Sequence, residues 1–97
     1  MRGEKMSRRD RADAALLALY QDGGYPMSLG AICRRLGLRR TPYMREIMAD
    51  VTRRGLALAV PVRAGSRTDT LYSLTPEGEV RARMLYGARM LYGVDAN

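Results

Sequence analysis

The spacing of apolar residues predicts a helix near the start of the chain, over about residues 8–21. One face of this segment carries apolar side chains at three- and four-residue intervals: Ala12, Ala15, Leu16, Leu19 and Tyr20. Ser7 followed by Asp10 resembles a capping box with Asp in place of Glu, because the hydroxyl accepts from a free N–H group and the carboxylate lies at the positive helix end. The sequence Asp-Gly-Gly at 22–24 suits a left-handed C-cap and ends the helix.

The next two apolar stripes predict a short helix and a longer one, joined by a turn. Ser28 can cap the short helix and Gly37 breaks it, and its apolar positions are Leu29, Ile32, Cys33 and Leu36. The longer helix is expected over 42–54, because Thr41 suits the N-cap position and Pro42 the first helical position, where a missing N–H costs nothing. Its apolar stripe is Met44, Ile47, Met48 and Val51.

Beyond the third helix the pattern becomes strand-like. Residues 56–63 and 70–74 are predicted to be the strands of a hairpin, joined by a Gly-containing turn, AGSRTD, with a basic tip. Pro61 lacks an N–H group, which indicates that its strand has a free edge there. Residues 25–27 (Tyr-Pro-Met) are predicted to form a short extended link, because the proline forces the residue before it out of the helical region.

Thr75 and Pro76 repeat the cap-and-proline signal and begin a last helix. It contains a repeat, RMLYGA and RMLYGV, whose two copies are six residues apart and therefore do not share a helix face. One face carries Val80, Met84, Gly87, Ala88 and Leu91, with Leu85 and Tyr92 to one side. Gly87 and Gly93 each weaken a helix by about 1 kcal/mol. Either the helix ends near Gly87 and packs on the core, or Gly87 lets another helix come close for self-association.

The basic charge is concentrated in one stretch of the chain. The net charge is +7, and 16 of the 17 basic residues are Arg. Between residues 34 and 67, nine arginines stand against Glu46 and Asp50, a local excess of +7, whereas eight basic and eight acidic side chains cancel elsewhere. A preference for Arg over Lys can reflect genome composition, but it does not explain the clustering. Such clustering is what a polyanion-binding surface requires.

The composition argues against membrane proteins, metal sites and most enzymes. Ninety-seven residues make one domain, and no stretch approaches the roughly 18 apolar residues of a membrane span. The charged start is unlike a signal peptide, so we expect a cytoplasmic protein. With one cysteine and no histidine, neither a zinc site nor a histidine base is expected. No phosphate-binding loop or nucleophile–base pair is present, so we expect no cofactor and no enzymatic activity.

The stretches LGLRRTPYMREIMADVTRRGLAL (36–58) and LYSLTPEGE (71–79) are similar to two parts of the winged-helix transcription regulators of the MarR and PadR types. The first resembles their turn and recognition helix, and the second their last wing strand and the following helix. The resemblance covers residues 7–86 and implies an α+β, mainly helical fold, a winged helix-turn-helix. It has a three-helix core, a wing hairpin of two or three strands and a C-terminal helix.

Two features depart from the family pattern. The turn before the third helix is one residue longer than usual, and Pro42 and Tyr43 stand where small polar residues are common. The chain also lacks the long flanking helices through which MarR proteins dimerise and bind ligands. The resemblance therefore carries over the fold but not the ligand-responsive mechanism.

The resemblance places base-reading positions on the outer face of the third helix, at Tyr43, Arg45, Glu46 and Ala49, with Arg53 on the same face. The chemistry agrees, because Arg45 can donate two hydrogen bonds to a guanine edge and Glu46 can accept one from cytosine. Alternatively, Glu46 is only a solvated partner for Arg45 or Arg53. Phosphate contacts are expected from the start of that helix and from the wing: Arg39, Arg40 and Thr41, and Arg63, Ser66 and Arg67.

The remaining reactive and aromatic side chains are expected to be structural. Cys33 lies in an apolar stripe and is predicted to be a small buried hydrophobe, since a thiol sensor needs exposure and a lowered pKa. Tyr20, Tyr25 and Tyr72 are predicted to lie at the edge of the core and not to stack on bases.

The leading hypothesis is a dimeric transcription regulator, most simply a repressor, that binds double-stranded DNA sequence-specifically. Each subunit is expected to place helix 42–54 in the major groove and wing 63–69 on the backbone or minor groove. The chain divides into a flexible arm (1–6), a winged-helix domain (7–86) and a tail (87–97). Homodimerisation is assigned to Met84, Leu85, Ala88, Leu91 and Tyr92. A protein–protein adaptor and a module that binds RNA or a replication origin are the alternatives.

Overall fold

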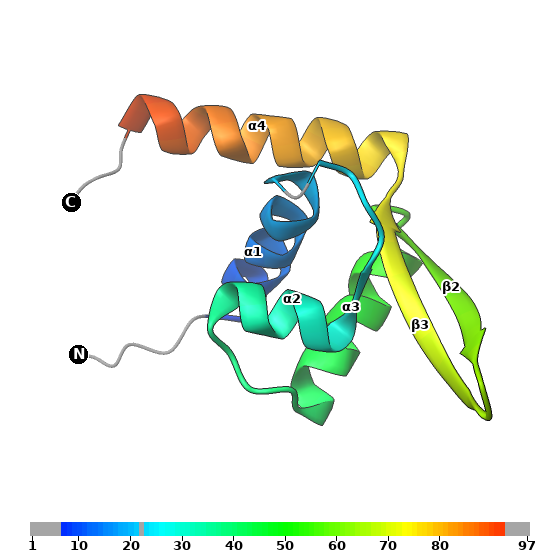
Figure 1. Ribbon diagram of the computed structural model, residues 1–97. Coiled ribbons are helices and arrows are strands. Elements are labelled where there is room, and N and C mark those ends of the chain that lie inside the picture. The colour runs from blue at the N-terminus through cyan, green and yellow to red at the C-terminus, as the bar shows by residue number, and fades with distance from the viewer. Residues whose placement is uncertain (1–6, 22, 93–97) are drawn as a thin grey trace.

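The computed structural model describes the backbone of residues 7–21 and 23–92, and their side chains up to Ala88. The elements are α1 (Arg8–Gln21), β1 (Met27–Ser28), α2 (Leu29–Leu36), α3 (Pro42–Arg53), β2 (Ala57–Ala64), β3 (Arg67–Leu74) and α4 (Pro76–Tyr92). Helices α1, α2 and α3 gather below α4, and the β2–β3 hairpin projects to one side (Figure 1). The predicted arm (1–6) and the end of the predicted tail (93–97) lie outside the described residues. In the described part of the chain, no helix is long and apolar enough to cross a membrane.

The predicted caps set the starts of the first three helices. Ser7 Oγ accepts from Asp10 N at 3.0 Å while Ser7 N donates to the Asp10 carboxylate at 3.4 Å, so the capping box is confirmed. Ser28 Oγ accepts from the N–H of α2 residue Ala31 at 3.1 Å. Thr41 Oγ1 accepts from Met44 N at 3.3 Å at the start of α3. Each cap satisfies an N–H group that the helix itself leaves without a partner.

The core lies where α1, α2 and α3 meet, with the sheet and α4 packed against its edges. The predicted stripe of α3 is confirmed, since no member is more than 1% exposed: Met44, Ile47, Met48 and Val51. Cys33 is buried as predicted, and burial raises the pKa of its thiol, although Arg40 and Arg11 act in the opposite direction. The thiol is therefore held in its neutral form.

Of the three tyrosines predicted at the core edge, one is placed elsewhere. Tyr72 is buried and Tyr20 is half-buried, as expected, but the side chain of Tyr25 is 73% exposed. Its ring lies over the glycine turn at Gly23, beside the core and not against it. The core-edge prediction for Tyr25 was wrong, because Tyr25 lies in the link before β1, which begins only at Met27.

The sheet is antiparallel with strand order β1-β3-β2, so β2 is an edge strand, as Pro61 predicted. The hairpin is longer than expected and its turn is shorter. Pairing runs from Ala57↔Leu74 to Ala64↔Arg67, which leaves only Gly65 and Ser66 in the turn. Gly65 has a φ of 66°, and a left-handed residue at this place allows a two-residue hairpin loop. The predicted six-residue turn is thus wrong.

The start of α4 is joined to the end of α3 through the Leu-Thr-Pro-Glu-Gly segment. Thr75 Oγ1 donates to Gly55 O at 2.6 Å and accepts from Gly78 N at 2.9 Å, and Thr75 N donates to Leu56 O at 3.2 Å. A Cβ atom at Gly78 would lie 1.8 Å from the Leu56 carbonyl oxygen. Glycine is therefore required here for the helix backbone to approach the chain before β2.

Helix α4 packs across α1 and continues through Gly87 to Tyr92, so the first of the two alternatives, a helix that ends near Gly87, was wrong. Arg81 pairs with Asp13 of α1 at 3.5 Å, and the rings of Tyr20 and Tyr86 lie 5.9 Å apart. Ala82 is fully buried against the core.

The apolar face of α4 identified from the sequence does not pack on this core. The side chain of Val80 is 51% exposed and that of Met84 is 67% exposed. Ala88 is also exposed, whereas Leu85 packs against the core cluster. The predicted positions Leu91 and Tyr92 belong to α4, but their side chains lie outside the described part. Val80, Met84 and Ala88 are referred to below as the outer face of α4.

Candidate nucleic-acid interface

The outer side of α3 is presented to solvent because its opposite side is locked into the core. Four buried residues span about two turns of this helix, so they fix its rotation about its own axis. The positions predicted to read bases consequently face outward, and all are exposed: Tyr43, Arg45, Glu46 and Ala49. Helix α3 and α2, joined by the turn at 37–41, form a helix-turn-helix.

The three residues predicted to contact phosphate at the start of α3 differ in exposure. Arg39 and Arg40 are exposed, whereas Thr41 is half-buried. The Thr41 hydroxyl oxygen accepts from Met44 N, which leaves its own O–H free to donate. This end of the helix carries the positive end of the helix dipole, so it favours an anion.

The wing meets α3 at a shared depression of about 210 Å³. Arg40 and Arg45 line it from the helix side, and Thr68, Asp69 and Thr70 line it from β3. Arg40 and Arg45 are thus brought next to the wing, although Thr68, the first of these β3 residues, lies 23 positions after Arg45 in the sequence. At the far end of the hairpin the three predicted wing residues, Arg63, Ser66 and Arg67, are all exposed. The recognition helix and the wing therefore form adjoining parts of one surface.

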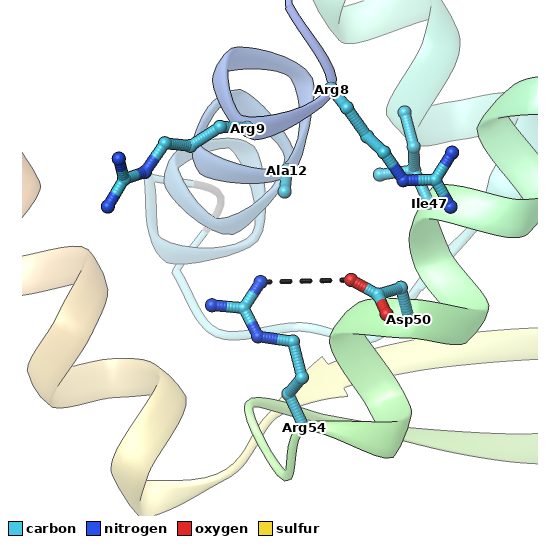
Figure 2. A pocket seen from close by; sticks show the side chains of 6 residues that line it. All are labelled: Arg8, Arg9, Ala12, Ile47, Asp50 and Arg54. Carbon is cyan, nitrogen blue, oxygen red and sulfur yellow. Dashed lines mark ion pairs between the residues drawn. The ribbon is translucent and has the colours of Figure 1, made fainter.

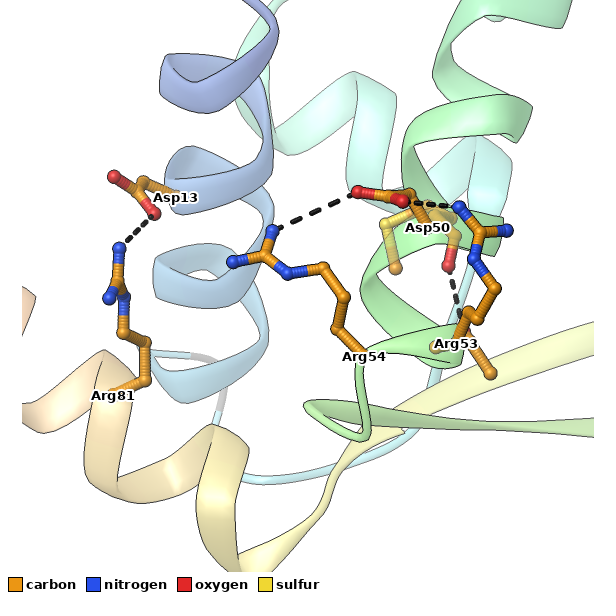
Figure 3. A network of polar contacts seen from close by, with 7 residues as sticks. Asp13, Asp50, Arg53, Arg54 and Arg81 are labelled. Atoms are coloured by element: carbon orange, nitrogen blue, oxygen red, sulfur yellow. Dashed lines mark hydrogen bonds and ion pairs between the residues drawn. The ribbon is translucent and has the colours of Figure 1, made fainter.

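Some of the arginines in the basic stretch are neutralised within the molecule. Asp50 pairs with Arg53, and also with Arg54 at 3.8 Å (Figure 3). Figure 2 shows Arg54 reaching between α1 and α3 toward Asp50, at a depression of about 410 Å³ that Arg8 also lines. Of these arginines only Arg53 was predicted to contact DNA, and one nitrogen of its guanidinium is paired with Asp50.

Two arginines of α1 also join this surface, and they were not among the predicted site residues. The guanidinium carbons of Arg8 and Arg11 lie 5.7 and 5.1 Å from the ring centre of Tyr43, within the range of cation–π contacts. Arg8 also pairs with Glu46 at 3.9 Å. The alternative raised for Glu46 named Arg45 or Arg53 as its partner, but Glu46 pairs with Arg8 of α1 instead. Arg8 and Arg11 are three residues apart on one helix face, which is the only sequence signal that links them.

The architecture is a winged helix-turn-helix with a three-stranded wing sheet and an additional C-terminal helix, as predicted. No group of three or more metal-ligating side chains occurs among the residues that the structure describes. Helix α3, the wing and the first turns of α1 adjoin one another on the exterior of this fold.

Solved structures with the same arrangement include transcription regulators. A PadR-like transcription factor from Bacteroides fragilis superposes with a TM-score of 0.74 at 14% identity, over 88% of this chain and 84% of that one. The protein smu.1704 from Streptococcus mutans superposes with a TM-score of 0.75 at 14% identity, over 94% of this chain and 86% of that one. NMB1585, a MarR family regulator from Neisseria meningitidis, superposes with a TM-score of 0.68 at 20% identity, over 84% of this chain and 55% of that one. At these identities the likeness establishes the fold. No family model and no curated protein sequence matches the chain.

Proposed function

We propose that the protein is a transcription regulator that binds double-stranded DNA through α3 and the wing. The observation that carries this proposal is the placement of the clustered arginines. Arg40 and Arg45 line one depression with β3, and Arg63 and Arg67 extend the same hairpin outward. A surface of this shape and charge suits a helix in the major groove beside a wing on the phosphate backbone or minor groove.

Within this arrangement the residues divide into two groups by their chemistry. Arg45 and Ala49 project from the exposed side of α3, where Arg45 can read guanine and Ala49 can contact a thymine methyl. Glu46 can accept from cytosine only when it leaves Arg8, so its contribution to specificity depends on that exchange. Arg39, Arg40 and Thr41 at the start of α3, together with Arg53 and the wing residues Arg63, Ser66 and Arg67, are assigned to phosphates.

We further propose that the protein acts as a homodimer through α4. The outer face of α4 exposes Val80 and Met84, large apolar side chains without a partner in the described part of the chain. Gly87 has open space where a Cβ would stand, so it allows a second helix to approach closely. A two-fold dimer matches half-sites about one helical turn of DNA apart, a spacing typical of repressors. Such a regulator acts on DNA in the cytoplasm and catalyses no reaction.

The same face of α4 favours one other function, a protein–protein adaptor, because an adaptor also needs an exposed apolar surface. An adaptor does not need arginines on both α3 and the wing. Recovery of a stoichiometric protein partner, together with no DNA affinity at low salt, would support the adaptor.

The first experiment is fluorescence anisotropy with a random duplex pool over a salt series, for the wild type and for the double variant Arg39→Ala/Arg40→Ala. We expect the logarithm of the binding constant to fall by about 0.9 per log unit of salt for each phosphate neutralised, and to fall less steeply in the variant. A matched random RNA duplex tests the RNA alternative in the same assay. Absence of binding at low salt would reject the proposed function.

A further inference from the structure

Arg11 of α1 carries a charge that nothing in the described part of the protein balances. Its side chain is half-buried, and its Nε atom is buried without a hydrogen-bond partner. Among the described residues it forms no ion pair, and its only side-chain contact of a polar kind is the cation–π contact with Tyr43. A partly buried guanidinium without an anion is unfavourable, because burial removes water that would solvate the charge.

Arg81 provides the comparison within the same molecule. Its Nε atom is also buried without a partner, but its Nη2 atom pairs with Asp13 at 3.5 Å. Both arginines lie between helices, and only Arg81 has a carboxylate. Arg11 is therefore the site where the structure leaves room for an external anion.

The surroundings of Arg11 define where such an anion would bind. Arg11 lines an open depression of about 550 Å³ with the helix-turn-helix turn and the start of α3: Gly37, Leu38, Arg39, Thr41 and Tyr43. Arg39 therefore adds a second guanidinium to the lining of the same depression. The Thr41 hydroxyl retains a free O–H, and the positive end of the α3 dipole lies at the same place. Among these lining residues none is acidic.

We propose that this depression holds one backbone phosphate of the bound DNA, contacted by Arg11 and Arg39, with Thr41 as a hydroxyl donor. The guanidinium of Arg11 can donate hydrogen bonds from its Nη groups to phosphate oxygens, and an anion bound there would balance its charge. Tyr43 is the ring on which Arg11 rests, so it positions the arginine. This inference rests on the proposed DNA binding and extends it, because it adds α1 as a third DNA-contacting element.

The test compares Arg11→Met with Arg83→Met in the salt series described above. Methionine keeps most of the apolar stem and removes the charge. Arg83 offers the same charge change on α4, where it is exposed and paired with Glu79 at 3.5 Å. We expect the slope of log binding constant against log salt to become shallower by about 0.9 for Arg11→Met and to stay unchanged for Arg83→Met. Arg11→Lys is expected to keep the wild-type slope, because the charge remains.

The outcomes separate the two proposals. If the wild type binds no DNA, the proposed function fails. If the wild type and the Arg39 variant show the expected salt dependence but Arg11→Met keeps the wild-type slope, only the phosphate site is overturned. Should Arg11→Met fail to fold, the Arg11 Nε–H resonance of the wild type is followed by NMR during titration with duplex DNA. A shift at saturation is expected, and an unmoved resonance would overturn the site.

Discussion

Helix α3 and the wing strand β2 both carry arginine side chains, but the protein holds the two elements in different ways. Helix α3 buries four large side chains completely, and they fix its outer face relative to the core. Strand β2 buries only Ala57, at its base, and Leu58, Val60 and Val62 remain exposed along its length. Base reading and contact with the DNA backbone have different structural requirements. A base-reading side chain must be held in register, whereas a phosphate contact tolerates movement of the hairpin.

The largest change in stability is expected from a substitution in the buried stripe of α3. Ile47→Ala should lower the free energy of unfolding by about 2–5 kcal/mol, because it leaves a cavity in a fully packed stripe. Val60→Ala removes methyl groups from the exposed wing and should change stability by less than about 0.5 kcal/mol. Urea denaturation of both variants measures the difference. Equal losses would show that the wing is packed as firmly as α3.

Alanine substitutions at Gly78 and Gly87 of α4 are expected to change stability by smaller amounts and in opposite directions. Gly78→Ala should destabilise by about 1–3 kcal/mol, because its Cβ would overlap the Leu56 carbonyl that leads into β2. Gly87→Ala meets no atom within 4 Å and should stabilise the helix by up to about 1 kcal/mol. Thermal melts followed by circular dichroism provide the measurement. Stabilisation by Gly78→Ala would contradict the close approach described here.

The cap of α3 tests what the Thr41 hydroxyl contributes to the stability of this helix and, through the proposed phosphate contact, to DNA binding. Thr41→Ala should cost about 1 kcal/mol of stability, since Met44 N loses its partner. Thr41→Ser keeps the hydroxyl oxygen and serves as the control, with near wild-type stability. DNA affinity should weaken in the alanine variant alone. A serine variant as unstable as the alanine variant would mean that the methyl group, and not the cap, is responsible.

The smallest effect on stability is expected at the tip of the wing. Arg67→Ala should change the free energy of unfolding by less than about 0.5 kcal/mol, because the residue is exposed and makes no ion pair among the described residues. In this variant, the slope of the log DNA-binding constant against log salt should nevertheless become shallower by about 0.9. An unchanged slope would show that the wing tip does not reach the backbone. The anisotropy series and a urea titration of the same preparation give both quantities.

Much of the fold follows from local patterns. The caps at Ser7, Ser28 and Thr41, and the buried stripe of α3, were predicted from residue types and spacing, because helix starts and helix faces depend on neighbours within one or two turns. The hairpin turn was predicted too long, since a two-residue turn at Gly65 and Ser66 also depends on how far the two strands pair.

The candidate interface was predicted only in the part that lies on single elements. The exposed positions of α3 and the wing tip follow from one helix face and one hairpin. Arg8 and Arg11 were missed, because their place beside Tyr43 depends on how α1 crosses α3. The inward side of α4 was also missed: Gly78 and Ala82 pack inward, while Val80 and Met84 face out.

The amino-acid sequence by itself determined where the first three helices begin, which side of α3 is buried, and where the arginines are concentrated. These properties are set by interactions between residues close together in the chain. Only the tertiary structure decided that Glu46 pairs with Arg8, that Arg11 lacks a counterion, and that α4 turns its apolar outer face to solvent. Each of these depends on the crossing of helices whose residues are more than 30 positions apart, and no local spacing encodes the angle at which two helices meet.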